Sequence, residues 1–181
     1  MYIFGQPVLR KVATEINPKE YEGLQELIQN MYETNRKADG VGLAAPQIGL
    51  SIRMFIIDLD VISDDKPEYK GFQHAFINPE IVEAGDETCD FEEGCLSVPG
   101  IHENVKRPKR IHVRYTDENL VEHDEWIDEF PARVFQHEYD HLDGKLFVDR
   151  LSAFRKQLIK SKLIAMSKGK VSTSYKSKPN H

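Results

Sequence analysis

The sequence predicts an α+β fold, with helices near both ends of the chain and most of the strands between them. Apolar residues recur at helical spacing in three segments, whereas short β-branched and alternating runs are concentrated between residues 52 and 127. Strands and helices do not alternate regularly, and the sequence has no internal repeat. A chain of 181 residues, 40% of them hydrophobic, can bury one core. We therefore expect one domain over residues 1–166, followed by a tail.

The first predicted helix opens at Asn17, which can cap the first turn, with Pro18 inside that turn. It should end before Gly40, and one face of it is apolar: Leu24, Leu27, Ile28, Met31 and Tyr32. Residues 40–49 include three glycines and a proline. This composition is typical of close backbone approach and does not favour a regular element.

The strands are predicted from short apolar runs. Residues 52–59 are largely β-branched or apolar and indicate a strand, and residues 60–73 then form a polar loop. Further strands are expected near residues 75–78, 81–91, 96–99, 111–116 and 120–127. The last two are joined by the polar cluster Thr116-Asp117-Glu118-Asn119, which predicts a hairpin.

Two more helices are expected in the C-terminal part of the chain. Residues 128–142 have an acidic start, Pro131 in the first turn and Gly144 just past the end. Residues 152–166 carry apolar residues at near-helical spacing. Residues 167–181 are rich in Lys, Ser and Thr, so we expect a basic, disordered tail.

The formal charge of −6 is unevenly distributed along the chain. Residues 150–181 carry nine bases and no acid, which leaves a net charge of −15 on residues 1–149. Because an acidic body repels the phosphate backbone, DNA is not an expected partner. The sequence has no apolar run of 18 residues and no secretory pattern in residues 1–10, which predicts a cytoplasmic protein with no membrane partner. Two cysteines, Cys89 and Cys95, are too few for a disulfide scaffold.

The most informative motif is His137-Glu138-Tyr139-Asp140-His141, within the second predicted helix. Residues four apart share a helix face, so both imidazoles can reach one metal ion while Glu138 reaches a water molecule bound to it. The alternative is an exposed helix turn with unrelated histidines. The apolar residues of the same helix count against this alternative, because buried histidines and a buried carboxylate need the compensation that a metal supplies.

A catalytic metal site needs a third protein ligand, and the downstream sequence offers none. The residue six positions after His141 is Phe147, which cannot bind a metal, and no acid follows Asp149. Upstream, Cys95 is the best candidate, because thiolates bind borderline divalent metals strongly. Cys89 is a rival, and four upstream histidines are further candidates: His74, His102, His112 and His123.

Three segments together resemble the peptide deformylase family in order and spacing: Gly40-Val41-Gly42-Leu43-Ala44-Ala45-Pro46-Gln47, Glu93-Gly94-Cys95-Leu96-Ser97 and Gln136-His137-Glu138-Tyr139-Asp140-His141. The resemblance extends from residue 1 to about residue 165 and favours Cys95 over Cys89 as the third ligand. It implies antiparallel sheets packed around a central metal-binding helix, with N-terminal and C-terminal helices.

The implied activity is removal of the formyl group from N-formylmethionine at the start of nascent polypeptides, which releases formate. The implied cofactor is one divalent metal, usually Fe(II), with Zn, Ni or Co able to replace it. Its ligands would be Cys95, His137 and His141. Glu138 would relay a proton from the bound water to the leaving nitrogen, and the oxyanion would be stabilised by the Gln47 side chain and the Leu96 backbone N–H.

The resemblance also implies a substrate site. Gly42 and its neighbours resemble an edge along which the substrate backbone pairs as an added strand. Candidate walls of a methionine pocket are Val41, Leu96 and Val134. Glu93 either orients part of this site or is a solvated charge. Many family members have Arg seven residues after the metal cysteine, where this chain has His102, and the sequence assigns His102 no role.

In some family members a basic C-terminal helix docks the enzyme on the ribosome, and the nine bases in residues 150–181 fit that use. A solubilising tail is the alternative. Two other classes of protein remain open. A general metallopeptidase would share the helical motif but has no use for Cys95 together with Gln47. A non-catalytic metal-binding protein would tolerate Glu138→Ala and Gln47→Ala without loss of any activity.

Overall fold

A computed structural model describes residues 1–179, and in this range it has three helices and two antiparallel sheets. The helices are α1 (Leu24–Lys37), α2 (Glu129–Leu142) and α3 (Ala153–Ser167). The strands are β1 (Gly42–Ala44), β2 (Met54–Asp58), β3 (Gln73–Ala84), β4 (Thr88–Cys95), β5 (Val98–Pro108), β6 (Arg110–Thr116) and β7 (Glu122–Asp128). The predicted α+β class is confirmed.

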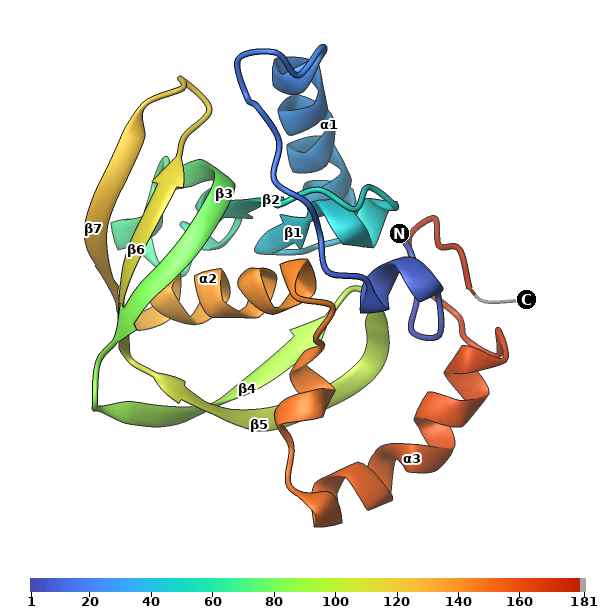
Figure 1. Ribbon diagram of the computed structural model, residues 1–181. Helices are drawn as coiled ribbons and strands as arrows, with labels where there is room; N and C mark the ends of the chain where they lie inside the picture. Colours follow the sequence, from blue (N-terminus) through green and yellow to red (C-terminus); the bar gives the residue numbers. More distant parts are fainter. Residues whose placement is uncertain (180–181) are drawn as a thin grey trace.

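Helix α2 lies at the centre of the molecule, between the two sheets (Figure 1). One sheet has the strand order β1-β2-β3-β6-β7, and the other is the two-stranded ribbon β4-β5. Phe135 of α2 packs on Phe55 of β2 and Phe76 of β3, with ring centroids 4.9 and 5.0 Å away. Each of these rings stabilises the fold by roughly 1.5–3 kcal/mol through burial. This packing fixes the position of α2 and leaves other faces of the helix for the functional site.

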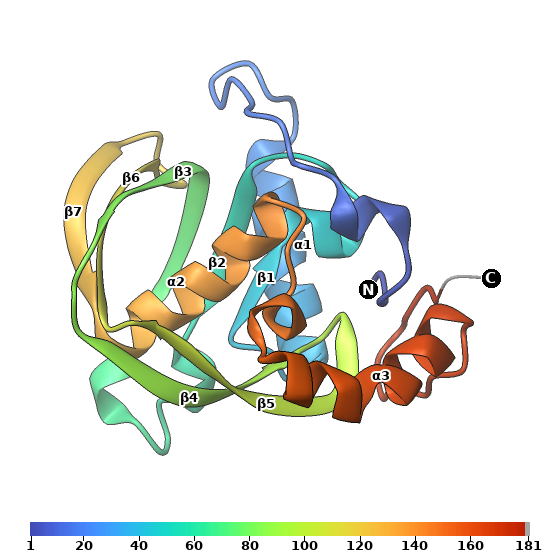
Figure 2. The ribbon, with the colours of Figure 1, turned by 60° about the horizontal axis from the view of Figure 1, so that its bottom comes forward.

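The other two helices cover opposite sides of this core. Helix α1 buries Ile28 and Met31 in a cluster with Leu43 of β1 and Ile56 of β2. Helix α3 lies beside β5 (Figure 2) and buries Ile159 in a cluster with residues of β5 and the N-terminus. Within residues 1–179, no helix is long and apolar enough to cross a membrane.

The first helix begins later than the sequence predicts. The structure places its start at Leu24, after Gly23, whose φ of 75° belongs to the left-handed region and interrupts a helix. The Asn17 side chain does accept a hydrogen bond from the backbone N–H of Lys19, at 3.2 Å. That bond closes a local turn, because the chain leaves helical geometry before a second turn can form.

The predicted strand boundaries were partly wrong. Residues 81–91 do not form one strand, because β3 ends at Ala84 and β4 begins at Thr88 after a turn. Strand β5 continues to Pro108, far beyond the predicted end at residue 99. Its inward positions alternate between apolar and charged residues: Ile101, Glu103, Val105 and Arg107. The two charged positions hide the period-two apolar pattern by which a strand is recognised.

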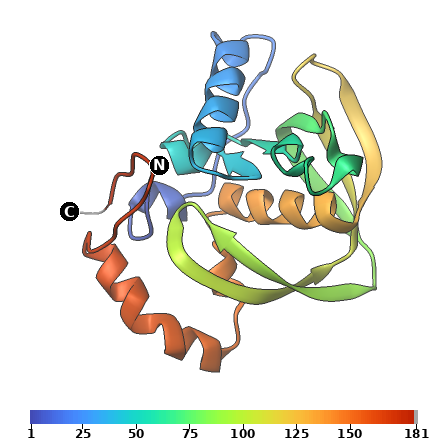
Figure 3. The ribbon, with the colours of Figure 1, turned by 180° about the vertical axis from the view of Figure 1, so that it is seen from behind.

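Residues 168–179, which belong to the predicted disordered tail, contact the N-terminus of the chain. After α3 the chain turns back and runs past the N-terminus (Figure 3). The backbone N–H of Lys178 donates to the Met1 carbonyl at 2.7 Å, and the N–H of Ile3 donates to the Lys178 carbonyl at 3.2 Å. These backbone contacts hold a segment whose composition alone offers few apolar groups. Residues 180–181, also part of the predicted tail, lie outside the described residues, and the division into a domain and a tail stays a prediction.

Candidate metal centre

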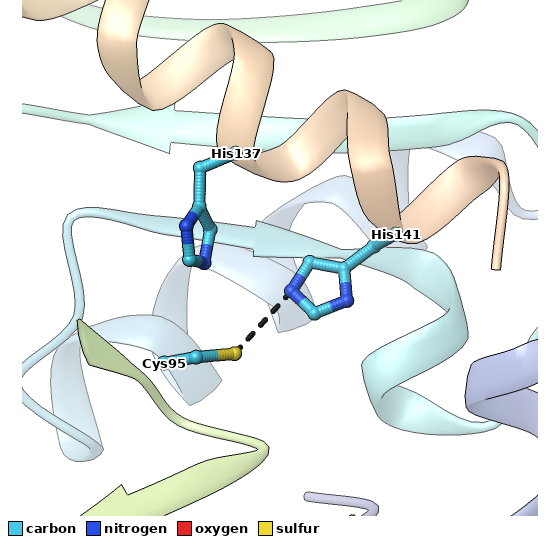
Figure 4. Close-up of side chains that lie close together, drawn as sticks. All are labelled: Cys95, His137 and His141. Carbon is cyan, nitrogen blue, oxygen red and sulfur yellow. Dashed lines mark hydrogen bonds between the residues drawn. The ribbon is translucent and has the colours of Figure 1, made fainter. Parts of the chain in front are cut away.

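The end of β4 brings Cys95 to the two histidines of α2. Cys95 is the last residue of β4 and pairs with Val98 of β5, so Leu96 and Ser97 form a two-residue turn between the strands. His137 and His141 lie one turn apart on α2, and both rings point toward the cysteine (Figure 4). The Cys95 Sγ and His141 Nε2 atoms are 3.4 Å apart. One potential ligand atom from each of the three residues lies within 4.8 Å of the others.

This spacing fits a divalent metal ion. Tetrahedral sites with sulfur and imidazole ligands have ligand atoms roughly 3.5 Å apart, given metal–ligand bonds of about 2.0–2.3 Å. Burial lowers the pKa of His141 well below its ordinary value, so the ring is neutral and has a lone pair to offer. The Nδ1 atom of His141 has no hydrogen-bond partner in the described part of the chain. Two imidazoles and one thiolate suit Fe(II), Zn, Ni and Co alike.

The orientation of His137 is set by Glu93 of β4. The Glu93 Oε2 atom lies 2.9 Å from His137 Nδ1, so Nε2 is the ring atom that remains to bind a metal beside Cys95. Such a carboxylate behind a metal-binding histidine fixes the tautomer and the ring orientation. Glu93 was predicted either to orient part of the substrate site or to be a solvated charge. It is only 6% exposed and its carboxylate is bound by side chains, so it is not a solvated charge, and its contact with His137 favours an orienting role.

Glu93 is itself held by two buried arginines. Arg107 of β5 donates to both of its carboxylate oxygens, at 2.7 and 2.9 Å, and Arg133 of α2 donates at 2.9 Å. Arg107 also donates to Asp140 at 2.8 Å. Burial alone would raise the pKa of Glu93, but hydrogen bonds from Arg107 and His137 outweigh it and hold the pKa well below the ordinary range. The carboxylate is therefore charged wherever the protein is folded near neutral pH.

Glu138 lies between the two histidines on α2 and is 4% exposed. Its carboxylate packs directly on β1, since a Cβ atom added to Gly42 would lie 2.7 Å from Glu138 Oε1. The other oxygen, Oε2, has no hydrogen-bond partner within residues 1–179. Burial raises the pKa of Glu138 to about 7, although the charge of His137 partly opposes this shift. A carboxyl group with such a pKa can both accept and return a proton near neutral pH.

Gln47 is fixed so that its amide nitrogen points toward the metal centre. It lies in a short 3₁₀ helix, η2 (Ala45–Ile48), and is 2% exposed. Its Oε1 atom accepts a hydrogen bond from the Ala44 N–H at 2.8 Å, which leaves the Nε2 group to face the other way. Nε2 lies 3.5 Å from Cys95 Sγ and 3.2 Å from Ser97 Oγ. A buried amide donor is thus directed at the place where the three potential ligands meet.

These groups open into one cavity of about 500 Å³. The cavity is lined by nearly all of the residues predicted for the site: Val41, Gly42, Gln47, Glu93, Cys95, Leu96, Val134, His137 and Glu138. His141 is buried behind them, at 1% exposed. Strand β1 ends its sheet, so its outer edge has no strand partner in the described residues. The cavity therefore combines a candidate metal site with a strand edge that has no partner in the described residues.

Other residues of the cavity were not predicted. Phe91 of β4 and Phe130 of α2 line it, with ring centroids 5.6 Å apart, and Ser172–Tyr175 reach it from the end of the chain. His102 also lines the cavity, and it packs against Gly94 at a point where a Cβ atom would be 2.7 Å from its ring. Phe91 and His102 stand in strands beside charged residues, so no pattern in the sequence distinguishes them from surface positions.

Most of the chain matches a known family. The family model for "Polypeptide deformylase" matches residues 1–157. The chain belongs to the polypeptide deformylase family. The peptide deformylase of Christiangramia forsetii is 48% identical over 180 residues, which cover 96% of this chain and 91% of that protein. The family predicted from the three motifs is confirmed.

Solved structures of polypeptide deformylases have the same fold. The peptide deformylase from Legionella pneumophila is 39% identical, with a TM-score of 0.79, and the match covers 93% of this chain and 94% of that one. The one from Thermotoga maritima is 45% identical, with a TM-score of 0.75, and covers 84% and 96%. As a family member, the chain is an enzyme that hydrolyses the N-formyl group of nascent peptides. This assignment decides against a general metallopeptidase and against a non-catalytic metal-binding protein.

Proposed function

We propose that this deformylase acts on N-formylmethionine through one divalent metal held by Cys95, His137 and His141, with Glu138 as the proton relay. The proposal rests on the meeting of these three side chains within 4.8 Å, beside a buried carboxyl group whose second oxygen has no hydrogen-bond partner in residues 1–179. When bound, such a metal lowers the pKa of water toward neutrality and polarises a formyl carbonyl group. The remaining steps depend on side chains of this protein.

Glu138 moves the proton. With a pKa of about 7 it is partly ionised at neutral pH and can accept a proton from the attacking water. It then returns this proton to the methionine nitrogen as the bond between that nitrogen and the formyl carbon breaks. The products are formate and a free amino terminus. The Glu138 carboxylate packs closely on Gly42, and this contact limits the movement of the carboxylate.

Gln47 and the backbone N–H of Leu96 are proposed to stabilise the oxyanion. The Gln47 amide is held in place by the Ala44 N–H, so it needs no reorganisation during the reaction. Donors fixed in advance are effective because they face charge that develops only in the transition state. Removal of one such donor typically costs about 3–4 kcal/mol of transition-state stabilisation.

The substrate backbone is proposed to pair along the outer edge of β1, beside Gly42. Main-chain pairing at a free strand edge binds a peptide irrespective of its sequence, and side-chain pockets then select residues. The methionine side chain would lie in the cavity against three apolar groups: Val41, Leu96 and Val134. A peptide bound in this way extends its formyl end toward Cys95.

We propose Fe(II) as the native metal. A ferrous ion with a thiolate ligand reacts readily with oxygen, and the sulfur can then be oxidised. Release of formate from formyl-Met-Ala-Ser should therefore be fastest with protein that is prepared anaerobically and loaded with Fe(II), and should decline in air. Protein loaded with Zn, Ni or Co is the comparison. Equal rates with Zn and Fe(II), both stable in air, would contradict the choice of iron.

The C-terminal helix is proposed to dock the enzyme on ribosomal RNA in the cytoplasm. Helix α3 and the residues after it expose basic side chains, and α3 also exposes Phe154 and Leu158, at 70% and 53%. Phosphate contacts of this kind weaken steeply with salt. Charge reversal of exposed bases, K156E/K160E, should abolish co-sedimentation with ribosomes at low salt, whereas E26K/E33K on α1 should not. Unchanged co-sedimentation of folded K156E/K160E would rule out this docking.

A further inference from the structure

The segment that follows α3 forms part of the active-site cavity. Ser172, Thr173, Ser174 and Tyr175 line this cavity together with the metal centre. The family-model match ends at residue 157 and does not include this segment. Cavities of 300–1,000 Å³ enclose ligands of drug size, so a volume of about 500 Å³ has room for more than a formyl group.

The position of the segment is fixed on both sides of Tyr175. Past it, the amino group of Met1 donates to the Lys176 carbonyl at 3.0 Å, and the Lys178 N–H donates to the Met1 carbonyl at 2.7 Å. Before it, the Thr173 hydroxyl donates to the Tyr175 carbonyl at 2.7 Å. Tyr175 is therefore held by contacts that do not involve the metal centre.

The Tyr175 side chain contacts the Leu96–Ser97 turn, which contains the proposed oxyanion donor, the Leu96 N–H. Its hydroxyl donates to the Leu96 carbonyl at 2.6 Å. Its ring packs against the apolar cluster that includes Val98, and Cys95 packs on the same cluster. One side chain from the end of the chain thus contacts the two-residue turn between β4 and β5.

This turn has special importance for the reaction. Leu96 follows the metal-binding Cys95 directly, and its own N–H is the proposed oxyanion donor. A two-residue turn is restrained by strand pairing on each side, here through Cys95 and Val98. The Leu96 carbonyl has no part in that pairing. Its hydrogen bond from Tyr175 restrains the peptide group that follows Leu96, whereas the Leu96 N–H belongs to the peptide group that precedes it.

We propose that Tyr175 is a positioning residue for deformylation: by binding the Leu96 carbonyl, its hydroxyl holds the Leu96–Ser97 turn so that the Leu96 N–H stays directed at the oxyanion. This inference rests on the proposed role of Leu96 in the reaction. Because the donor acts in the transition state, loss of the hydroxyl should lower kcat and leave KM nearly unchanged. A hydrogen bond is worth about 0.5–1.5 kcal/mol, which corresponds to roughly a two- to tenfold loss of rate.

The test compares Tyr175→Phe with a matched control, Tyr2→Phe. Phenylalanine keeps the ring of residue 175 and removes only the hydroxyl. Tyr2 also contacts the C-terminal segment, since its hydroxyl accepts a hydrogen bond from Lys178 Nζ at 3.4 Å, but it has no hydrogen bond to Leu96 in the described residues. Metal content should be the same in both variants and the unaltered enzyme, and loss of one hydrogen bond should lower the midpoint of thermal unfolding by no more than about 6 °C.

Two measurements decide the outcome. With formyl-Met-Ala-Ser, Tyr175→Phe should lower kcat about two- to tenfold with KM nearly unchanged, and Tyr2→Phe should leave kcat unchanged. Amide hydrogen exchange at Leu96 and Ser97, measured without substrate, should be faster in Tyr175→Phe alone. Unchanged kcat and exchange in Tyr175→Phe, or equal losses in both variants, would overturn the proposal. If no variant and not even the unaltered enzyme released formate, the proposed chemistry would fail, and the exchange data would still decide whether Tyr175 holds the turn.

Discussion

Replacing Glu138 with glutamine should lower kcat for formate release by about 10²–10⁴-fold, the typical contribution of a positioned acid or base. Glutamine keeps the shape of the side chain beside Gly42 but cannot accept or return a proton. Since burial raises the pKa of Glu138 to about 7, the native group is suited to both transfers near neutral pH. The two histidines and Cys95 do not depend on this carboxylate for their positions, so metal content should stay the same.

The measurement is steady-state release of formate from formyl-Met-Ala-Ser, with the metal in each preparation determined in parallel. Glu129→Gln is the matched control, because it removes a carboxylate from the exposed first turn of the same helix. It should leave kcat within twofold of the unaltered enzyme. A Glu138→Gln enzyme with full metal content and nearly native kcat would exclude Glu138 as the proton relay.

Replacing Cys95 with serine should remove the metal and, with it, all activity. A serine hydroxyl is not ionised near neutral pH, so the site would lose both a negative charge and its only sulfur ligand. Loss of a residue that merely supports a ligand costs roughly 10–100-fold in metal affinity, and loss of the ligand itself should cost more. Added metal should raise the midpoint of thermal unfolding of the unaltered enzyme, because the metal binds only the native state. It should not raise the midpoint of Cys95→Ser.

Cys89→Ser is the matched control for this experiment. The Cys89 Sγ atom lies 3.2 Å from Arg133 Nη2, and a serine oxygen can accept the same hydrogen bond. After dialysis against a weak chelator, Cys89→Ser should retain one metal per chain and Cys95→Ser none. One metal per chain in both variants would show that Cys95 is not a ligand.

The helix that carries the site could be predicted because its signals are local. Residues 128–142 combine an acidic start, an apolar side and the two histidines, and the structure places α2 at Glu129–Leu142. The helix predicted over residues 152–166 was also found, and the Ser152 side chain accepts a hydrogen bond from the Arg155 N–H at its start. Both helices depend on residues within a few positions of one another.

The supporting residues of the site could not be predicted, since their partners are distant in sequence. Arg107 is 1% exposed and pairs with Glu93 and Asp140, which stand 14 and 33 positions away. Only the fold brings these charges together, and in the sequence an arginine in a charged strand resembles a surface residue. Burial of Arg107 also explains why the full length of β5 was not predicted: charged residues at inward positions break the alternation of apolar and polar residues.

The contacts of the C-terminal segment could not be predicted for a related reason. Its composition of Lys, Ser and Thr is typical of disordered chains. Its order comes instead from backbone hydrogen bonds to Met1 and Ile3 and from one aromatic side chain, Tyr175. Amino-acid composition does not predict backbone hydrogen bonds of this kind, because nearly every residue type has the same backbone N–H and C=O groups.

X-ray absorption at the metal edge of the loaded enzyme tests most directly whether one ion is held jointly by Cys95, His137 and His141. We expect one sulfur and two imidazole nitrogens among the nearest neighbours of the metal, and we expect the sulfur signal to be absent in any metal that Cys95→Ser retains. A coordination shell of nitrogen and oxygen alone in the unaltered enzyme would contradict the site described above.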